Sequence, residues 1–188
     1  MQAESKANAA SQPAGPTVSH RRFGMPGALA TALVLAAIIV IADQVTKAAI
    51  TARYGPCGST AFTPVLGTHA GFSYVCNTGT AFSRFQDTPL VWLPVLVAVG
   101  AVAWLWMRSL STPHLLQQIA FGLILGGAVG NVIDRARLGY VVDFVDLRLT
   151  QTLRWYVFNV ADASIFFGVV LLALAFWRAE TARGTSTA

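Results

Sequence analysis

The stretch Phe158-Asn159-Val160-Ala161-Asp162-Ala163-Ser164 opens a run of apolar residues that ends near Trp177. A run of roughly twenty apolar residues is long enough to cross a membrane as a helix. A charged side chain at the centre of such a helix costs about 2.5–3.5 kcal/mol on insertion scales, so intramembrane acids usually mark functional sites. Asp162 is therefore a candidate functional residue, and its partner must lie elsewhere in the chain.

The composition points to a membrane protein. The 188 residues are 55% hydrophobic and only 11% charged, and the mean hydropathy is +0.59. Soluble domains carry about 25% charged residues, so this chain is predicted to be a polytopic helical membrane protein. The net charge of +5 is modest and comes without a block of Lys and Arg. No nucleic-acid partner is predicted.

The apolar runs predict an all-α membrane protein with four transmembrane helices in one domain, residues 23–178. The predicted spans are about 23–42, 90–107, 115–133 and 158–177. The polar residues 1–22 predict a disordered tail, and 179–188 predict a second, short tail.

The segments between the spans have different characters. Residues 53–88 are rich in Gly, Pro, Thr and aromatics and predict an extramembrane β segment, with Gly71–Cys76 the most strand-like part. A second loop is expected between the last two spans. In the third span Gly122, Gly126 and Gly130 recur every four residues, a spacing that favours close helix packing over chemistry.

Charge counts alone do not orient the chain. Four spans put both tails on one side. The tails and the turn at Arg108 carry six Lys and Arg residues, and the other two segments carry seven. Arg21 and Arg22 abut the first span, so we expect both termini in the cytoplasm.

The sequence contains two cysteines, Cys57 and Cys76, without the spacing of a zinc site. Both belong to the same predicted extramembrane segment. We expect two free thiols; a disulfide is the alternative if that side of the membrane is oxidising.

Polar residues gather on one face of the membrane. The ends of the first and third helices and the start of the fourth all fall there, and polar groups at this depth need partners. The face is predicted to hold a converging set: Asp43, Lys47, Asn77, Asn131, Asp134, Arg135, Asp143, Asn159 and Asp162. Asp43 and Lys47 are four apart and can pair along one helix face.

The residue types favour acid chemistry. His20, His69 and His114 are poorly placed to act as a base, and no metal or other cofactor is expected from this set. Two neighbouring carboxylates cannot both ionise easily, so one keeps its proton at neutral pH. Such a pair acts as base toward water and as acid toward a carbonyl oxygen.

Three acids compete to be the partner of Asp162. Asp134 resembles a paired structural acid at a helix end, and Asp146 precedes Leu147-Arg148, a more solvated setting. Asp143 lies between Val142 and Phe144, where apolar neighbours favour a raised pKa. These considerations favour Asp143 weakly and leave the choice open.

The ordered motifs DQVTK (43–47), NTGTAF (77–82), GNVIDR (130–135), VVDF (141–144) and FNVADAS (158–164) resemble those of the bacterial lipoprotein signal peptidases, also called signal peptidase II. The resemblance covers roughly residues 25–177. It implies an intramembrane aspartyl endopeptidase that cleaves diacylglyceryl-modified prolipoproteins before the lipidated cysteine. It also implies a multi-pass monomer in the inner membrane, in contact with membrane lipid. The implied fold has four helices, a small extracytoplasmic β-cradle and a second periplasmic loop or short helix, with the active site near the periplasmic face.

The resemblance also implies roles for individual residues. Asp143 and Asp162 become the catalytic pair, and Asn77, Asn131 and Arg135 are expected to hold the substrate backbone. The other substrate-binding or supporting positions are Asp43, Lys47, Gly79, Asp134 and Asn159.

Two other classes compete with a peptidase. A transporter or proton relay also uses intramembrane acids, but here no charge lies at mid-span in the second and third helices. A structural scaffold without catalysis leaves the buried acids unexplained, because apolar residues stabilise packing at least as well.

Overall fold

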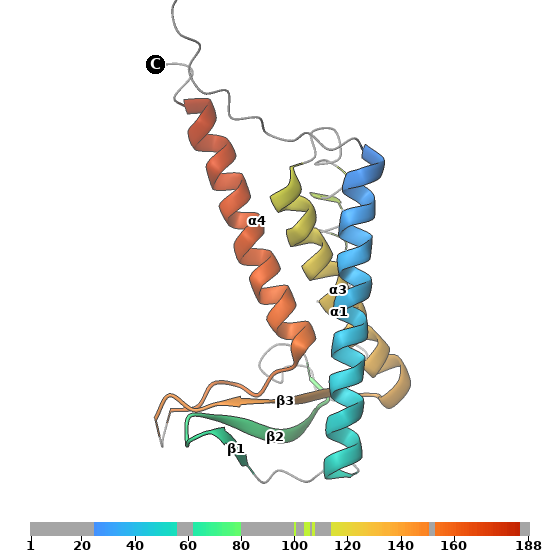
Figure 1. The fold of residues 1–188 in the computed structure, drawn as a ribbon, viewed down its shortest axis with the longest axis vertical. Helices are drawn as coiled ribbons and strands as arrows, with labels where there is room; N and C mark the ends of the chain where they lie inside the picture. The colour runs from blue at the N-terminus through green and yellow to red at the C-terminus, as the bar shows by residue number, and fades with distance from the viewer. Residues whose placement is uncertain are drawn as a thin grey trace, which may run out of the picture.

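The computed structural model describes residues 25–55, 62–79, 100, 104–105, 107, 114–150 and 153–184. Three long helices stand side by side, and a small sheet lies across one of their ends (Figure 1). The helices are α1 (Met25–Tyr54), α3 (Leu115–Leu138) and α4 (Val160–Gly184). The strands are β1 (Thr63–Leu66), β2 (Ala70–Asn77) and β3 (Val141–Leu147).

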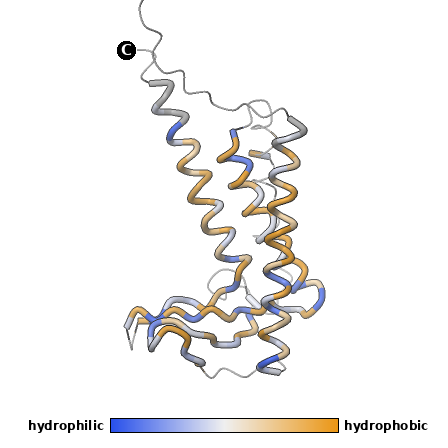
Figure 2. The backbone as a smooth tube through the Cα atoms, in the orientation of Figure 1, coloured by the Kyte–Doolittle hydropathy of each residue, from blue (hydrophilic) through white to orange (hydrophobic). Residues whose placement is uncertain are grey.

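These helices have the length and composition of membrane spans. Three apolar segments within the described residues qualify, namely Leu29–Tyr54, Leu115–Leu138 and Val160–Arg178. Hydrophobic residues dominate the lengths of α1 and α4 (Figure 2). The predicted span 90–107 lies outside the described residues except for Gly100, Trp104, Leu105 and Met107, which are helical.

Helix α1 is longer than the sequence analysis predicted. The expected first span ended at about residue 42, but the helix continues through the DQVTK motif to Tyr54. No Gly or Pro interrupts residues 28–54, and Asp43 pairs with Lys47 one turn later within the helix. The helix ends only at Gly55, whose φ of 78° is readily adopted by glycine.

Helix α3 packs between α1 and α4. A Cβ on Gly122 would meet Leu35 and the Ala32 carbonyl of α1, and a Cβ on Gly126 would meet Ile39. The packing role predicted for the glycine spacing is therefore confirmed at these two positions. Close approach here brings the polar ends of the helices together.

The sheet is antiparallel, in the order β1-β2-β3. Strand β2 contains the predicted Gly71–Cys76 stretch. The loop or short helix expected between the last two spans is wrong for residues 141–147, which form β3. This stretch is rich in β-branched residues, and its pairing with β2 satisfies its backbone groups. The register places Val75 opposite Asp143 and Asn77 opposite Val141.

The expectation of free thiols is also corrected. Cys76 is disulfide-bonded, and the only other cysteine of the sequence is Cys57, outside the described residues. Two cysteines in one extramembrane segment are compatible with either state, and the sequence did not show whether that side of the membrane is oxidising.

Candidate active site

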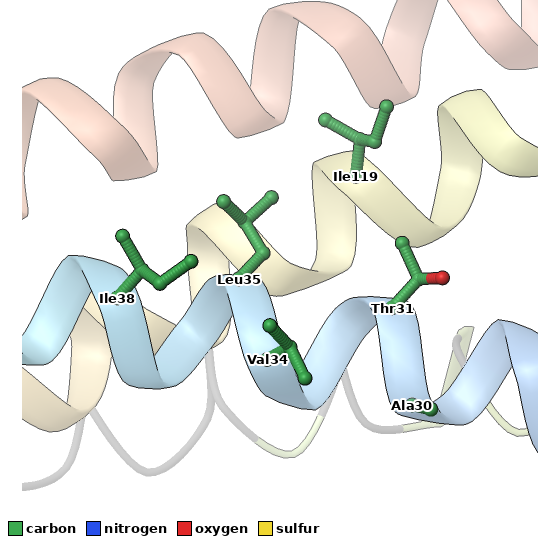
Figure 3. Close-up of a pocket in the computed structure, with 6 residues that line it drawn as sticks. All are labelled: Ala30, Thr31, Val34, Leu35, Ile38 and Ile119. Carbon is green, nitrogen blue, oxygen red and sulfur yellow. The ribbon is translucent and has the colours of Figure 1, made fainter.

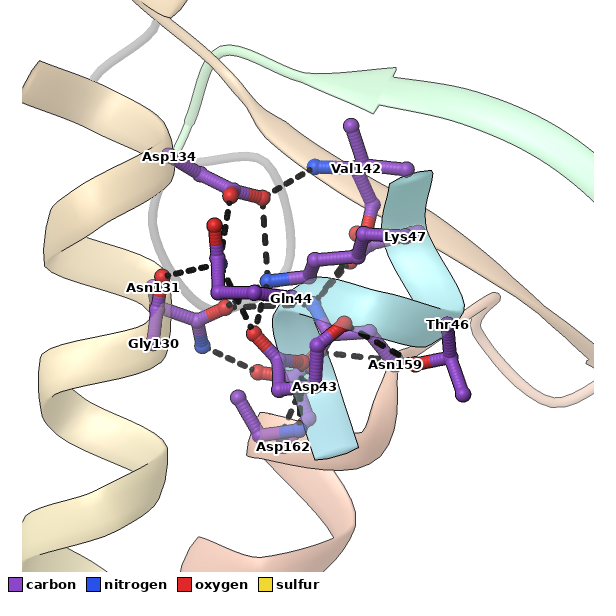
Figure 4. A network of polar contacts seen from close by, with 12 residues as sticks. Asp43, Gln44, Thr46, Lys47, Gly130, Asn131, Asp134, Val142, Asn159 and Asp162 are labelled. Carbon is purple, nitrogen blue, oxygen red and sulfur yellow. Dashed lines mark hydrogen bonds and ion pairs between the residues drawn. The ribbon is translucent and has the colours of Figure 1, made fainter. Parts of the chain in front are cut away.

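A continuous set of hydrogen bonds and ion pairs links every site residue expected from the sequence. The set joins α1, α3, α4, β2 and β3 where the helices meet the sheet, and Figure 4 shows the part around Lys47. Its members are Asp43, Lys47, Asn77, Gly79, Asn131, Asp134, Arg135, Asp143, Asn159 and Asp162. The predicted convergence of polar residues on one face is confirmed.

Lys47 is the central cation of this set. Its Nζ lies 2.8 Å from Asp43 Oδ2 and 2.9 Å from Asp134 Oδ2. It also donates to Asn131 Oδ1 at 3.1 Å. All four side chains are buried. One ammonium thus compensates two carboxylates and fixes one amide among buried side chains.

Asp43 connects this cation to the start of α4. Its Oδ1 accepts the Ala161 backbone N–H at 3.0 Å, one of the N–H groups that a helix leaves unpaired in its first turn. A Cβ on Gly130 would lie 2.6 Å from Asp43 Oδ2. The absence of a side chain at Gly130 therefore leaves room for this carboxylate.

The first turn of α4 is closed by two reciprocal hydrogen bonds. Asn159 Oδ1 accepts the Asp162 N–H at 2.8 Å, and Asp162 Oδ2 accepts the Asn159 N–H at 3.3 Å. This arrangement is a capping box, with Asp in place of the usual Glu. It fixes the Asp162 carboxylate at the helix N-terminus, where the helix dipole favours a negative charge.

Asp143 and Asp162 are joined through two asparagines. Asn159 Nδ2 donates to Asp143 Oδ1 at 2.7 Å, and Asn131 Nδ2 donates to Asp162 Oδ1 at 2.8 Å. Asn159 Nδ2 also contacts Asn131 Oδ1 at 3.1 Å. Since Lys47 can only donate, Asn131 must turn its oxygen toward the ammonium and its NH₂ toward Asp162.

The pKa of Asp143 is raised strongly. Burial, followed by the negative charge of Asp162, raises the pKa of Asp143 from 3.8 to about 7. Hydrogen bonds from Asn77 and Asn159 lower this pKa and limit the rise. Near neutral pH the Asp143 carboxyl is therefore poised between its two forms.

The end of β2 supplies the third side of the site. Asn77 Nδ2 donates to Asp143 Oδ2 at 3.1 Å, and Asn77 Oδ1 accepts the Gly79 N–H at 3.0 Å. Arg135 NH2 donates to the Gly79 carbonyl at 2.9 Å. The Arg135 Nε is buried and has no hydrogen-bond partner among the described residues.

Gln44 also belongs to the site, although the sequence analysis did not select it. Its Nε2 donates to Asp134 Oδ1 at 2.9 Å and to the Gly130 carbonyl at 3.2 Å, and it lies 3.2 Å from Asp43 Oδ2. Its position within DQVTK could have indicated this role, because a buried amide in a membrane helix needs hydrogen-bond partners.

The two rival acids have other partners. Asp134 accepts from Lys47, Gln44 and the Val142 backbone N–H, the last at 3.0 Å. The expectation that Asp134 is paired is therefore confirmed, with Lys47 as its cation.

Asp146 was expected in a more solvated setting, and this was wrong. It is fully buried, and it accepts from Ser73 at 2.7 Å, Arg154 at 2.7 Å and Arg148 at 3.2 Å. Burial tends to raise the pKa of Asp146, but these three donors outweigh it and hold the pKa below its usual value. Asp146 therefore fastens the sheet as an anion.

Other features of the described residues offer no comparable chemistry. An open apolar groove of about 600 Å³ runs between α1 and α3 (Figure 3). It is lined by Ala30, Thr31, Val34, Leu35, Ile38 and Ile119 and carries no acid or base. Within the described part of the chain, no three His, Cys, Asp or Glu side chains are arranged to hold a metal ion.

Helices long and apolar enough to span a membrane, with two carboxyl groups linked through asparagines at one end, are features of an intramembrane aspartic peptidase. Comparison with known proteins agrees with this class. The family described as "Signal peptidase (SPase) II" matches residues 35–178, and the chain belongs to this signal peptidase II family.

Individual relatives and structures agree. The chain is 40% identical to the lipoprotein signal peptidase of Moorella thermoacetica, over 74% of this chain and 88% of that one. It is 40% identical to that of Thermosynechococcus vestitus, over 76% and 89%. A solved bacterial membrane enzyme matches with a TM-score of 0.68 and 27% identity, over 85% of this chain and 92% of that one. A second matches with a TM-score of 0.65 and 26% identity, over 84% and 96%.

Proposed function

We propose that this protein removes signal peptides from diacylglyceryl-modified prolipoproteins by cleaving before the lipidated cysteine. The observation that carries the proposal is the carboxylate pair of buried Asp143 and half-buried Asp162, bridged by Asn159. Membership of the signal peptidase II family and relatives named lipoprotein signal peptidase support the same reaction.

The two carboxyls take different roles at the start of the reaction. Asp162, at the N-terminus of α4 with a donor from Asn131, is the anion that takes a proton from water. Asp143, whose pKa is raised to about 7, carries the proton that passes to the scissile carbonyl oxygen. The tetrahedral intermediate then collapses: the C–N bond breaks as Asp162 gives its proton to the leaving nitrogen, and Asp143 takes back a proton from a hydroxyl of the intermediate.

Neighbouring groups are suited to hold the substrate backbone. Arg135 Nε is a buried donor with no partner among the described residues, and Asn77 offers an amide beside Asp143. An extended peptide presents carbonyl and N–H groups that would pair with such side chains. Gly79, Asn131 and Asn159 support these groups through their own hydrogen bonds.

We place the protein in the bacterial cytoplasmic membrane, with both termini in the cytoplasm and the site near the periplasmic face. The disulfide at Cys76 supports this orientation, because disulfides persist in oxidising compartments. The proposed arrangement is a monomer with four spans, the second at residues 90–107, a β-cradle within 53–88, and tails at 1–22 and 179–188. Apolar grooves such as the one between α1 and α3 would receive acyl chains of the substrate or of membrane lipid.

A transporter or proton relay remains less well supported. In the described parts of α3 and α4, charged residues lie toward the ends of the helices, and the middle of each helix has none. Along these two helices, the described residues therefore provide no chain of titratable groups from one end to the other.

The substrate class is tested with the purified full chain in detergent, without added metal or nucleotide. The diacylglyceryl prolipoprotein and the same precursor lacking the lipid are compared, and the product N-terminus is identified by mass spectrometry. We expect cleavage of the lipidated precursor before its modified cysteine. Proton flux in liposomes without cleavage of either precursor would contradict the proposal.

A further inference from the structure

The disulfide is attached close to the carboxylate pair. Cys76 is the residue before the last of β2, and it pairs with Val142 of β3. It also packs against the buried cluster that contains Ile50, Tyr74 and Phe144. The disulfide of Cys76 is therefore anchored in the core of the sheet, and the sequence has one other cysteine, Cys57, outside the described residues.

The residues that follow Cys76 enter the site directly. Asn77 donates to Asp143 Oδ2 at 3.1 Å, and the Gly79 carbonyl accepts from Arg135 at 2.9 Å. Between them, the Gly79 N–H donates to Asn77 Oδ1 at 3.0 Å. The position of the end of β2 thus sets the position of one of the two amides that contact Asp143.

This end of β2 is restrained on one edge only within the described residues. Strand β3 pairs with Cys76 and Asn77. The pairing of β1 with β2 covers only residues 70–72 of β2. Strand ends paired on a single edge open locally at a low free-energy cost. A covalent crosslink one residue before Asn77 opposes this opening by restricting the chain.

We propose that Cys76 is a positioning residue of the active site, whose disulfide keeps the end of β2 in place so that the Asn77 amide stays on Asp143. The inference rests on the proposed peptidase function. Cys76 itself contacts neither of the two carboxylates in any described interaction; it acts through Asn77.

The first test compares full-length Cys57→Ser/Cys76→Ser with wild type in the lipoprotein cleavage assay across pH. Asp143 is faced by Asp162 from α4, Lys47 from α1 and Arg135 from α3, and the variant leaves all three unchanged. Because the Asn77 hydrogen bond lowers the pKa of Asp143, its loss moves the alkaline limb of the pH–rate profile to higher pH. We expect the same direction and size of shift in Cys57→Ser/Cys76→Ser as in Asn77→Ala.

Combining the loss of the disulfide with Asn77→Ala tests whether the disulfide acts on Asp143 through Asn77. In an Asn77→Ala background, removal of the disulfide should move the limb no further, because the contact that it supports is already gone. Ser73→Ala is the matched control on the same strand. It removes a donor to Asp146, so it should lower the melting temperature without moving the limb.

Reduction provides a second route to the same state. A phosphine supplies two electrons to the disulfide and becomes its oxide with oxygen from water, and the two protons from water complete the two thiols. Wild type should then show the shift of the double-serine variant, and that variant should not respond to the phosphine.

Two results overturn the inference. If wild type cleaves and the double-serine variant keeps the wild-type pH limb while losing only thermal stability, the disulfide is structural and Cys76 has no positioning role. If wild type fails to cleave any lipidated precursor, the proposed function fails, and this inference fails with it.

Discussion

At the scale of single residues, the site depends on one buried ammonium. Lys47 faces Asp43 and Asp134 together and orients Asn131. Removing one partner of a buried ion pair leaves an uncompensated charge and costs about 3–5 kcal/mol. The same loss would release Asn131, which donates to Asp162. Both the stability of the fold and the position of the Asp162 carboxyl therefore depend on Lys47.

Lys47→Met should lower both stability and rate. We expect a loss of about 3–5 kcal/mol in the free energy of unfolding, and a cleavage rate lowered about 10²-fold because the carboxylate pair is displaced. Thermal unfolding in detergent and the cleavage assay measure the two effects. Lys47→Arg keeps the charge but changes its geometry, so it should retain more stability than activity. Wild-type activity in Lys47→Met would contradict this role.

The pH dependence follows from Asp143. Its pKa of about 7 means that the proton donor is lost as the pH rises through 7. The value of kcat/KM should therefore fall on the alkaline side with a midpoint near this pKa, approaching tenfold per pH unit above it. A profile that stays flat from pH 6 to 9 would contradict the assignment of Asp143 as the acid.

The same pKa has a consequence for stability with a definite sign. Asp143 binds its proton more tightly in the folded chain than in the unfolded one, because its pKa rises from 3.8 to about 7. Between these values the folded chain holds more protons, so the free energy of unfolding falls as the pH rises. In unfolding experiments from pH 4 to 7, Asp143→Asn should make the free energy of unfolding less dependent on pH. An unchanged pH dependence would mean that groups other than Asp143 cause it.

At the scale of elements, the site needs α1, α3 and α4 in close approach. Gly130 of α3 leaves room for the Asp43 carboxylate, and Asp43 accepts the Ala161 N–H of α4. The sheet adds Asp143 from β3 opposite Val75 of β2. Three helices and two strands must therefore hold their places for the carboxylate pair to form.

Gly130→Ala should disrupt this arrangement. A Cβ there would lie 2.6 Å from Asp43 Oδ2, and overpacking of this kind costs about 1–3 kcal/mol. We expect lower thermal stability together with a lower kcat. Gly139→Ala is the control, because its φ of 80° imposes strain while its Cβ would meet nothing within 4 Å. It should lower stability without lowering kcat in the remaining folded protein. Equal effects of the two variants on kcat would contradict the proposed role of Gly130.

At the scale of the whole molecule, composition and motifs predicted the membrane class and the convergence of the polar residues. Because an unpaired charge is costly in lipid, Asp43, Lys47 and Asp162 were expected to lie in one polar cluster. Strand β3 was not predicted, because a short run rich in Val and Asp lacks the alternation of a half-buried strand.

Other features depend on contacts that sequence patterns do not contain. The burial of Asp146 depends on Ser73 and Arg154 reaching the same oxygen from other segments. Gln44 gains its role from Gly130 and Asp134 across the helix interface. Residue types alone left Asp134, Asp143 and Asp146 as rivals, and it was the motif resemblance that selected Asp143.

The central claim is that Asp143 and Asp162 together hydrolyse the peptide bond, and the most direct measurement is cleavage of a diacylglyceryl prolipoprotein by Asp143→Asn, Asp162→Asn and Asp134→Asn. We expect no detectable product from the first two variants, with melting temperatures that show folded protein. Asp134→Asn, which removes a charge outside the pair, should retain a reduced rate. Cleavage by either Asp143→Asn or Asp162→Asn at a rate near wild type would contradict the account.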